Sequence, residues 1–236
     1  MTENKPQDQA KRNAAEAALA HVKDGMRLGI GTGSTAAIFV DLLAARVKAG
    51  LNVVGVPTSE RTAQQCRERG VQLTTLDETP ELDLGIDGAD EFDPELNLIK
   101  GAGGALLREK IVASCCLKFI VIADETKRVP VLGAFDLPVE VIQMAATPIT
   151  QVIEGYGATV ALRRDRWGEA FITDENNIIL DCAFGPNIKD PVTLAHNLSG
   201  LAGMVEHGLF IGMCDEVIVG KTDGFESVVT NRKDRL

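Results

Sequence analysis

The sequence has few aromatic residues, few histidines and no long apolar run. Aromatic side chains make up 4% of the 236 residues, and there are three His. The formal net charge is -10, which together with the shortage of aromatics argues against nucleic acid as a partner. The longest apolar stretches are far below the roughly 20 residues of a membrane span, and the polar N-terminus lacks the apolar core of a signal peptide. We therefore expect a cytoplasmic protein with no membrane partner.

Cysteine patterns that signal disulfides or zinc are also missing. The five Cys are odd in number and include no C-x-x-C pair, as is typical of reduced and mostly buried thiols. The residues form no Ser/His/Asp grouping and no Cys/His ligand cluster, so the sequence argues against a hydrolase of that kind and against a zinc site.

What the sequence does contain is an alternation of apolar strands and amphipathic helices. Strands are expected at 26–30, 53–56, 71–76, 82–86 and 117–123. Helices are expected between the first and second, the second and third, and the last two of these strands. This alternation favours an α/β fold, a doubly wound and mostly parallel Rossmann-like sheet. After Asp124 the elements are shorter and include an expected hairpin of 170–173 with 178–182. We predict a discontinuous larger domain, 1–136 plus 208–236, and a smaller α+β insert at 137–207.

A glycine loop follows the first predicted strand. Gly31-Thr32-Gly33-Ser34-Thr35-Ala36 fits the G-x-G-x-x-A pattern of dinucleotide sites. The second strand ends Val56-Pro57-Thr58-Ser59, however, without the acidic residue that binds the ribose of a dinucleotide. The alternatives are a single phosphate held by helix amides and nearby hydroxyls, or a tight turn with no ligand.

Two carboxylates share a turn in the run Asp87-Gly88-Ala89-Asp90-Glu91, at the end of the strand 82–86. Open α/β sheets usually bind ligands at such strand ends. Six acidic residues and no basic one lie between Asp83 and Glu95, so like charges are expected to keep at least one carboxyl protonated near neutrality. A metal site and a solvated acidic turn are the alternatives, although the spacing does not match a calcium loop.

Lys100 precedes a second glycine loop, Gly101-Ala102-Gly103-Gly104. Because side chains there are small or missing, backbone amides can approach an anion. The loop lies between the acidic turn and the start of a helix. The two alternatives for this loop are an anion-binding site and a flexible connection without a ligand.

Glu109 lies on the helix that follows, in the sequence Arg108-Glu109-Lys110. A Glu inside a helix is usually solvated, and its two charged neighbours are typical of a surface. Lys127 follows the strand that ends at Ala123 and lies where it can reach the carboxyl-end crevice. The alternative is that Lys127 is an ordinary charged residue of a surface loop.

Taken in their order along the chain, these motifs closely resemble ribose-5-phosphate isomerase of the A type. The resemblance rests on residues 31–35, 87–91, 100–104 and 108–110, and it extends along nearly the whole chain, including 137–141. Four motifs in the right order are far more specific than any one of them. One departure is Ala102, which stands where a third glycine is common.

The resemblance implies an isomerase that interconverts ribose 5-phosphate and ribulose 5-phosphate in the non-oxidative pentose phosphate pathway. Glu109 would match the catalytic base, while Asp87 and Lys100 would assist ring opening and charge stabilisation. The substrate-binding residues implied are Thr32, Gly33, Ser34, Thr35, Asp87, Gly88, Ala89, Asp90, Lys100, Gly101, Ala102, Gly103 and Lys127, the last as a phosphate contact.

The chemistry of this reaction agrees with the residues. One carboxylate must move a proton between C1 and C2 through an enediolate, and cations or amides must stabilise the oxyanion. No cofactor and no metal are required. The family resemblance also implies a homodimer, with contacts expected from the smaller domain.

Two other functions remain as alternatives. A sugar-phosphate-binding regulatory module would normally carry a DNA-binding helix-turn-helix, for which the N-terminal residues leave no room. A CoA transferase would use a glutamate nucleophile on a similar scaffold, but 236 residues leave little space for CoA.

Overall fold

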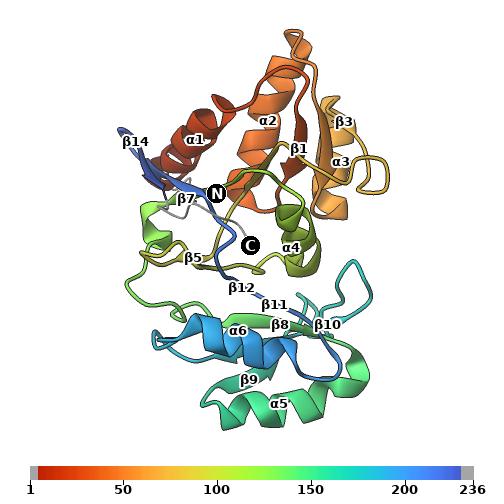
Figure 1. Ribbon diagram of the computed structural model, residues 1–236, viewed down its shortest axis with the longest axis vertical. Helices are drawn as coiled ribbons and strands as arrows, with labels where there is room; N and C mark the ends of the chain where they lie inside the picture. Colours follow the sequence, from red (N-terminus) through yellow and green to blue (C-terminus); the bar gives the residue numbers. More distant parts are fainter. Residues whose placement is uncertain (1–4, 230–236) are drawn as a thin grey trace. The chain divides into compact units, whose positions relative to one another are not determined.

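The computed structural model describes residues 5–229 of the chain (Figure 1). The chain forms two compact units. The larger unit takes the residues up to Ala89, Arg108–Arg128 and those from Gly212 onward, and the smaller unit takes Asp90–Leu107 and Val129–Ile211. None of the helices within 5–229 is long and apolar enough to cross a membrane.

A seven-stranded sheet forms the centre of the larger unit. Six strands are parallel, namely β1 (Arg27–Ile30), β2 (Val54–Pro57), β3 (Gln72–Leu73), β4 (Leu84–Asp87), β7 (Phe119–Asp124) and β13 (Glu216–Lys221). The seventh, β14 (Gly224–Val229), pairs antiparallel with β13. The order is β3-β2-β1-β4-β7-β13-β14, so the strand order reverses between β1 and β4. In doubly wound sheets ligands bind at such a point, outside the carboxyl ends of the strands.

Helices cover both faces of this sheet. The helices of the larger unit are α1 (Lys5–Leu19), α2 (Ser34–Lys48), α3 (Glu60–Arg69), the 3-10 helix η1 (Glu125–Lys127) and α4 (Leu106–Ser114) from its residue 108 on. On one face, Ile30 of β1 and Ile86 of β4 share a buried core with α1 and α2, which lie side by side in Figure 1. Because side chains alternate along a strand, Gly29 and Gly85 point to the opposite face.

These two glycines determine how closely α4 approaches the sheet. A Cβ atom on Gly29 would lie 2.7 Å from Cγ1 of Val112, and a Cβ atom on Gly85 would lie 2.6 Å from Sγ of Cys116. Both distances are far below van der Waals contact, so any side chain at either position would push the helix away. The helix that carries Glu109 thus packs closely on the backbone of β1 and β4 at Gly29 and Gly85. We call these two glycines the glycine notch.

Ordinary capping residues fix the two ends of α3. The Ser59 side chain caps α3 by accepting a hydrogen bond from the Thr62 N–H, and Gly70 ends the helix in the left-handed conformation at φ 79°. The predicted strand at 71–76 is only the two-residue β3, at the edge of the sheet. The edge strand β14 was not predicted, since its half-buried alternation carries no strong apolar signal.

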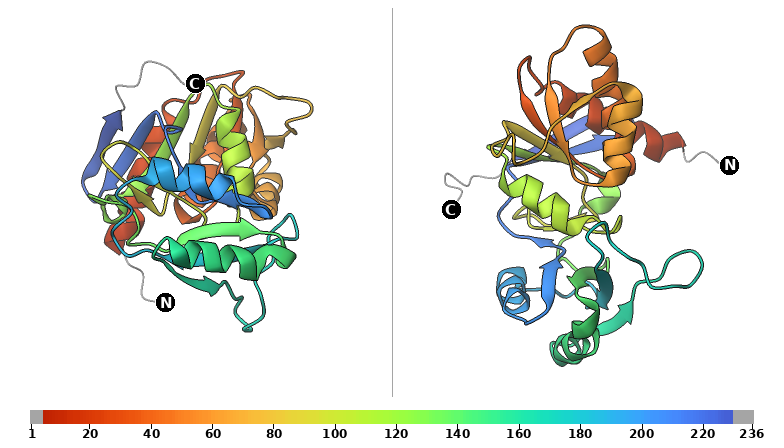
Figure 2. Two further views of the ribbon diagram at one scale, coloured as in Figure 1. Left: turned by 60° about the horizontal axis from the view of Figure 1, so that its bottom comes forward. Right: turned by 90° about the vertical axis from the view of Figure 1, so that its right-hand side faces the viewer.

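The smaller unit is built on a four-stranded antiparallel sheet with the order β11-β8-β10-β9. Its elements are β8 (Leu137–Val141), η2 (Gln143–Ala145), α5 (Ala146–Gly155), β9 (Thr159–Leu162), β10 (Ile178–Ala183), α6 (Pro191–Ser199) and β11 (Met204–His207). Alternate residues of β8 and β10, such as Val139 and Leu180, share a buried core with Ile153 of α5 and Leu198 of α6. Both helices therefore cover one face of the sheet (Figure 2).

A second, three-stranded sheet joins segments that are far apart in sequence. It has the order β12-β6-β5, with β5 (Glu91–Phe92), β6 (Leu98–Ile99) and β12 (Leu209–Phe210) all antiparallel. The smaller unit thus includes 90–107 and 129–136 in addition to the insert expected at 137–207. That 137–207 alone form a domain stays a prediction.

The expected hairpin of 170–173 with 178–182 is wrong in part. Strand β10 is present, but its only pairing with 170–173 within the described chain is an isolated bridge between Ile172 and Ile178. The turn itself forms, since the Thr173 N–H donates to the Asn177 carbonyl at 2.9 Å and Asn176 takes φ 62°. Ile172 is exposed, so it gains too little burial to extend the ladder.

The close packing of α1 on β13 gives the first prediction. A Cβ atom on Gly220 would overlap with the Ala10 carbonyl of α1, so Gly220→Ala should lower the free energy of unfolding by about 1–3 kcal/mol. Gly155→Ala is the matched control, because it places a methyl group in open space at the end of α5 and should be neutral or slightly stabilising. Urea denaturation compares the two, and equal stability would contradict the packing described.

Candidate active site

Asp87 ends β4 at the point where the strand order reverses. The residue is only 1% exposed. Its Oδ1 atom accepts hydrogen bonds from the Thr32 N–H at 3.0 Å and from the Gly88 N–H at 2.7 Å. Hydrogen bonds from amides to a carboxylate are stronger than those between neutral groups. The structure thus holds this side chain in one orientation and brings together three of the predicted site residues.

Gly31 makes this arrangement possible. A Cβ atom at this position would overlap with the Asp87 carboxylate and its Cα atom. The Gly31 N–H donates to the Ile86 carbonyl at 2.9 Å, which ties the end of β1 to β4. The first glycine of the loop therefore leaves room for a carboxylate from the neighbouring strand.

The rest of the loop leads into α2. Gly33 is the N-cap residue at φ 124°, a conformation that favours glycine, and it provides no side-chain cap. Ser34 is exposed and Thr35 is buried at the start of the helix. A helix N-terminus with amide and hydroxyl donors suits a phosphate group. This geometry is the one expected for a phosphate loop.

Glu109 lies in the first turn of α4 and is 4% exposed. The interpretation as a solvated helix residue is therefore wrong. Arg108 instead points to the surface and pairs with Glu60 at 2.8 Å, and its hydrogen bond lowers the pKa of Glu60. Because the glycine notch lets α4 sit close to the sheet, Glu109 is buried between two less buried charged neighbours.

Lys127 is the last residue of η1 and is half-buried. Just before it, the side chain of Asp124 accepts hydrogen bonds from the Thr126 N–H and hydroxyl, and one of 3.4 Å from Gln7 Nε2 of α1. Burial acts in the opposite direction, but these hydrogen bonds hold the pKa of Asp124 below its usual value.

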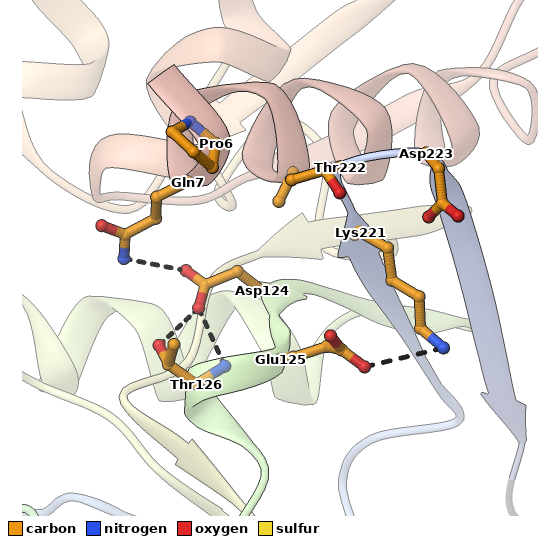
Figure 3. A pocket seen from close by; sticks show the side chains of 10 residues that line it. Pro6, Gln7, Asp124, Glu125, Thr126, Lys221, Thr222 and Asp223 are labelled. Carbon is orange, nitrogen blue, oxygen red and sulfur yellow. Dashed lines mark hydrogen bonds and ion pairs between the residues drawn. The ribbon is translucent and has the colours of Figure 1, made fainter. Parts of the chain in front are cut away.

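A cavity of about 380 Å³ adjoins this segment, at the carboxyl ends of β7 and β13 (Figure 3). It is lined by Pro6, Gln7, Ala10, Asp124, Glu125, Thr126, Gly220, Lys221, Thr222 and Asp223. Figure 3 shows Lys221 directed at Glu125, with the two charged atoms 3.6 Å apart. None of these residues was predicted as a site residue.

In the smaller unit, Lys100 follows β6 and is 2% exposed. Its backbone N–H donates to the Gly208 carbonyl at 2.9 Å, and Nζ lies 5.5 Å from the centre of the Phe210 ring. Lysine is almost never fully buried unless its charge is compensated, and the face of the Phe210 ring provides part of that compensation.

The second glycine loop is fixed by side chains from the same unit. Ala102 donates its N–H to Asp90 Oδ2 at 2.9 Å, while the side chain of Arg163 donates to the Gly101 carbonyl at 2.7 Å. Asp181 holds that Arg163 by two hydrogen bonds, of 2.5 and 3.0 Å. Ala102 and Gly103 are exposed at the tip of the loop. These hydrogen bonds restrain the second glycine loop, for which a flexible connection was one alternative.

Sequence reasoning missed Arg163 and Asp181. The two residues lie 18 positions apart, and their meeting depends on the pairing of β9 with β10. Neither belongs to a motif, so no local signal marks them.

The acidic run has more than one electrostatic environment. Burial is the main cause that raises the pKa of Asp93, and the charge of Glu95 adds a smaller contribution. In the larger unit, hydrogen bonds from Arg27 lower the pKa of Asp83. Within residues 5–229, no group of three or more His, Cys, Asp or Glu side chains is arranged to hold a metal ion.

Comparison with known proteins identifies the family. A sequence model of the ribose 5-phosphate isomerase A (phosphoriboisomerase A) family matches residues 54–224. Ribose-5-phosphate isomerase A of Bradyrhizobium diazoefficiens is 52% identical, over 97% of this chain and 98% of the relative. The same enzyme of Sinorhizobium fredii is 55% identical, over 92% of this chain and 95% of the relative. The chain belongs to the ribose-5-phosphate isomerase A family.

A solved structure supports the same assignment to the isomerase family. A D-ribose-5-phosphate isomerase in complex with phospho-erythronic acid is 38% identical, with a TM-score of 0.92, and the match covers 94% of this chain and 99% of the other. The resemblance seen in the motifs and the predicted α/β fold with a mostly parallel sheet are therefore confirmed.

The close approach of the Asp87 side chain to Gly31 gives the second prediction. Gly31→Ala should lower the free energy of unfolding by roughly 1–3 kcal/mol, because the added methyl group overlaps with Asp87. Gly88→Ala is the matched control, since the nearest atoms to its Cβ atom would be 3.9 and 4.0 Å away. Thermal denaturation measures both, and a Gly31→Ala protein as stable as the control would contradict the close approach.

Proposed function

We propose that this member of the family interconverts ribose 5-phosphate and ribulose 5-phosphate, in the non-oxidative pentose phosphate pathway. The observation that carries the proposal is the burial of Glu109. A carboxylate of 4% exposure between two more exposed charged residues is an unusual position for a glutamate on a helix, and buried ionisable groups are common at functional sites. The family membership supplies the substrate.

Glu109 is the general base in this proposal. It removes the proton from C2 of the open-chain aldose and returns it to C1, through an enediolate. A single carboxylate suffices when the proton leaves C2 and is returned to C1 on the same face of the planar intermediate. A positioned base of this kind contributes roughly 10²- to 10⁴-fold in rate.

Lys100 and the amides of Gly101, Ala102 and Gly103 stabilise the negative charge that develops on the substrate oxygen. The buried position of the ammonium supports this role, because electrostatic stabilisation is strongest where water is excluded. The bracing by Arg163 also supports it, since an oxyanion site must be fixed before the reaction begins.

Asp87 acts before the proton transfer. Ribose 5-phosphate is mostly cyclic, and its ring must open before C2 can lose a proton. Asp87 exchanges a proton with the ring oxygen and O1, and its fixed orientation on Thr32 and Gly88 supports that role. The proton transfers need no cofactor.

The phosphate is held by the first glycine loop, residues Thr32, Gly33, Ser34 and Thr35, together with Lys127. Amides and hydroxyls at the start of α2 provide donors suited to a phosphate, and Lys127 supplies a positive charge. Gly88, Ala89 and Asp90 complete the substrate-binding residues. The hydrogen bond from Ala102 to Asp90 supports a joint role of the acidic turn and the second glycine loop.

Phospho-erythronic acid provides an inhibitor for this chain. A relative was solved in complex with it, and its planar carboxylate resembles an enediolate while its phosphate resembles that of the substrate. We expect competitive inhibition against ribose 5-phosphate, since mimics of the transition state bind more tightly than substrates.

The proposal extends to the assembly and the location of the protein. We propose a homodimer with contacts from 137–207, a sugar phosphate as the small-molecule partner, no nucleic-acid or membrane partner, and a place in the cytoplasm. The net charge of -10 supports the absence of nucleic acid.

The third prediction concerns Glu109. Glu109→Gln keeps the size of the side chain and removes its basic oxygen, so kcat should fall by about 10²- to 10⁴-fold with only a modest change in KM. Exchange of the carbon-bound substrate proton with deuterated solvent should fall in parallel, because the same carboxylate makes both transfers.

Glu68→Gln, on the exposed surface of α3, is the matched control and should keep full activity. The readout is a direct assay of ribulose 5-phosphate formation, with circular dichroism to confirm folding. If folded Glu109→Gln protein kept more than about a tenth of the wild-type kcat, the base would have to lie elsewhere, with Asp90 the next candidate.

A further inference from the structure

Four hydroxyl groups form one buried cluster in the larger unit. They belong to Thr32, Thr58, Ser59 and Thr62, none of which is more than 9% exposed. The oxygen of Thr32 lies 2.7 Å from that of Thr58 and 2.8 Å from that of Ser59. The oxygen of Thr62 lies 3.1 Å from that of Ser59 and 3.1 Å from the Gly31 carbonyl oxygen. Only Thr32 was predicted as a site residue.

The direction of the hydrogen bonds follows from counting hydrogens, since each hydroxyl has one to donate. Thr62 donates to the Gly31 carbonyl, Ser59 donates to Thr62, and Thr32 donates to Ser59. The hydrogen of Thr32 is then used, so Thr58 must be the donor to Thr32. The Thr32 oxygen also lies 3.1 Å from that of Thr62, so whether its hydrogen goes to Ser59 or to Thr62, the chain of hydroxyls ends at Thr62 and the Gly31 carbonyl. Hydrogen bonds in such a chain polarise one another.

The chain ends on the peptide group that holds Asp87. The Gly31 carbonyl and the Thr32 N–H belong to the same planar peptide unit. Its oxygen accepts from Thr62, and its N–H donates to Asp87 Oδ1 at 3.0 Å. Fixing one end of a planar group fixes the direction of the other. The Thr62 hydroxyl therefore determines where the Thr32 N–H points.

We propose that Thr62 is a positioning residue for Asp87, acting through the Gly31–Thr32 peptide group, with Ser59 and Thr58 completing the chain. The inference rests on the proposed isomerase activity and on the ring-opening role of Asp87 within it. Because the connection between β2 and α3 and the first turn of α3 supply these hydroxyls, the second strand–helix connection serves the reaction without any contact to substrate being required.

The test is Thr62→Val, which keeps the branched shape and removes the hydroxyl. We expect kcat from ribose 5-phosphate to fall about 5- to 20-fold, with KM changed less than about twofold, because the phosphate contacts remain. Exchange of the C1 proton of ribulose 5-phosphate, which is already open, should fall much less. Thr62→Ser restores the hydroxyl and should recover kcat to within about twofold.

A double-mutant cycle shows whether Thr62 acts through Asp87. In an Asp87→Asn background, Thr62→Val should lower kcat by less than about twofold, since the group it positions is already altered. Additive effects in the cycle, or a rise in KM with kcat unchanged, would overturn the inference.

Two further variants keep the test decisive. Thr173→Val removes an equally buried hydroxyl, bonded to Glu140 in the smaller unit, and should leave kcat within about twofold of wild type. If Thr62→Val protein does not fold, Thr58→Val removes the first donor of the chain without touching the α3 cap, and it should lower kcat with the same non-additivity. A wild-type chain without isomerase activity would refute the proposed function itself, whereas an active chain with additive effects would refute this inference alone.

Discussion

The larger unit depends on one packing contact, in which the buried carboxylate of Asp87 lies directly against Gly31. Asp87 reaches its two amide donors only because Gly31 has no side chain. Because β1 and β4 are neighbours at the point where the strand order reverses, this contact also joins the two halves of the sheet. The first glycine loop therefore accommodates a side chain from the adjacent strand.

The three proposed catalytic side chains share the property of burial. Asp87, Lys100 and Glu109 are each at most 4% exposed, and transferring a charge from water costs several kcal/mol unless it is compensated. Each is held by a neighbouring glycine feature: Gly31 beneath Asp87, a glycine loop after Lys100, and the Gly29 and Gly85 notch beneath the helix of Glu109. Burial of this kind places the proposed catalytic groups where electrostatic interactions are strong.

Local signals in the sequence predicted much of this and long-range contacts did not. The parallel strands, the Ser59 cap and the Gly70 end of α3 follow from apolar runs and capping residues, which act within a few positions. The burial of Glu109 depends on two glycines in distant strands, and the bracing Arg163 depends on strand register. No local signal marks the hydroxyls of Thr58 and Thr62, because their partners lie in the glycine loop that follows β1. Motif order led to the proposed site residues, while the contacts that hold them could be seen only in the fold.

The central claim is that a carboxylate moves the proton through an enediolate, and isotope incorporation tests it most directly. Wild-type protein is incubated with ribose 5-phosphate in deuterated water, and the ribulose 5-phosphate formed is examined by nuclear magnetic resonance. The account predicts isomerisation with solvent deuterium at C1, because the proton on Glu109 can exchange with water before it is returned. Isomerisation with complete transfer of the C2 hydrogen and no solvent deuterium would indicate a hydride shift and contradict the account.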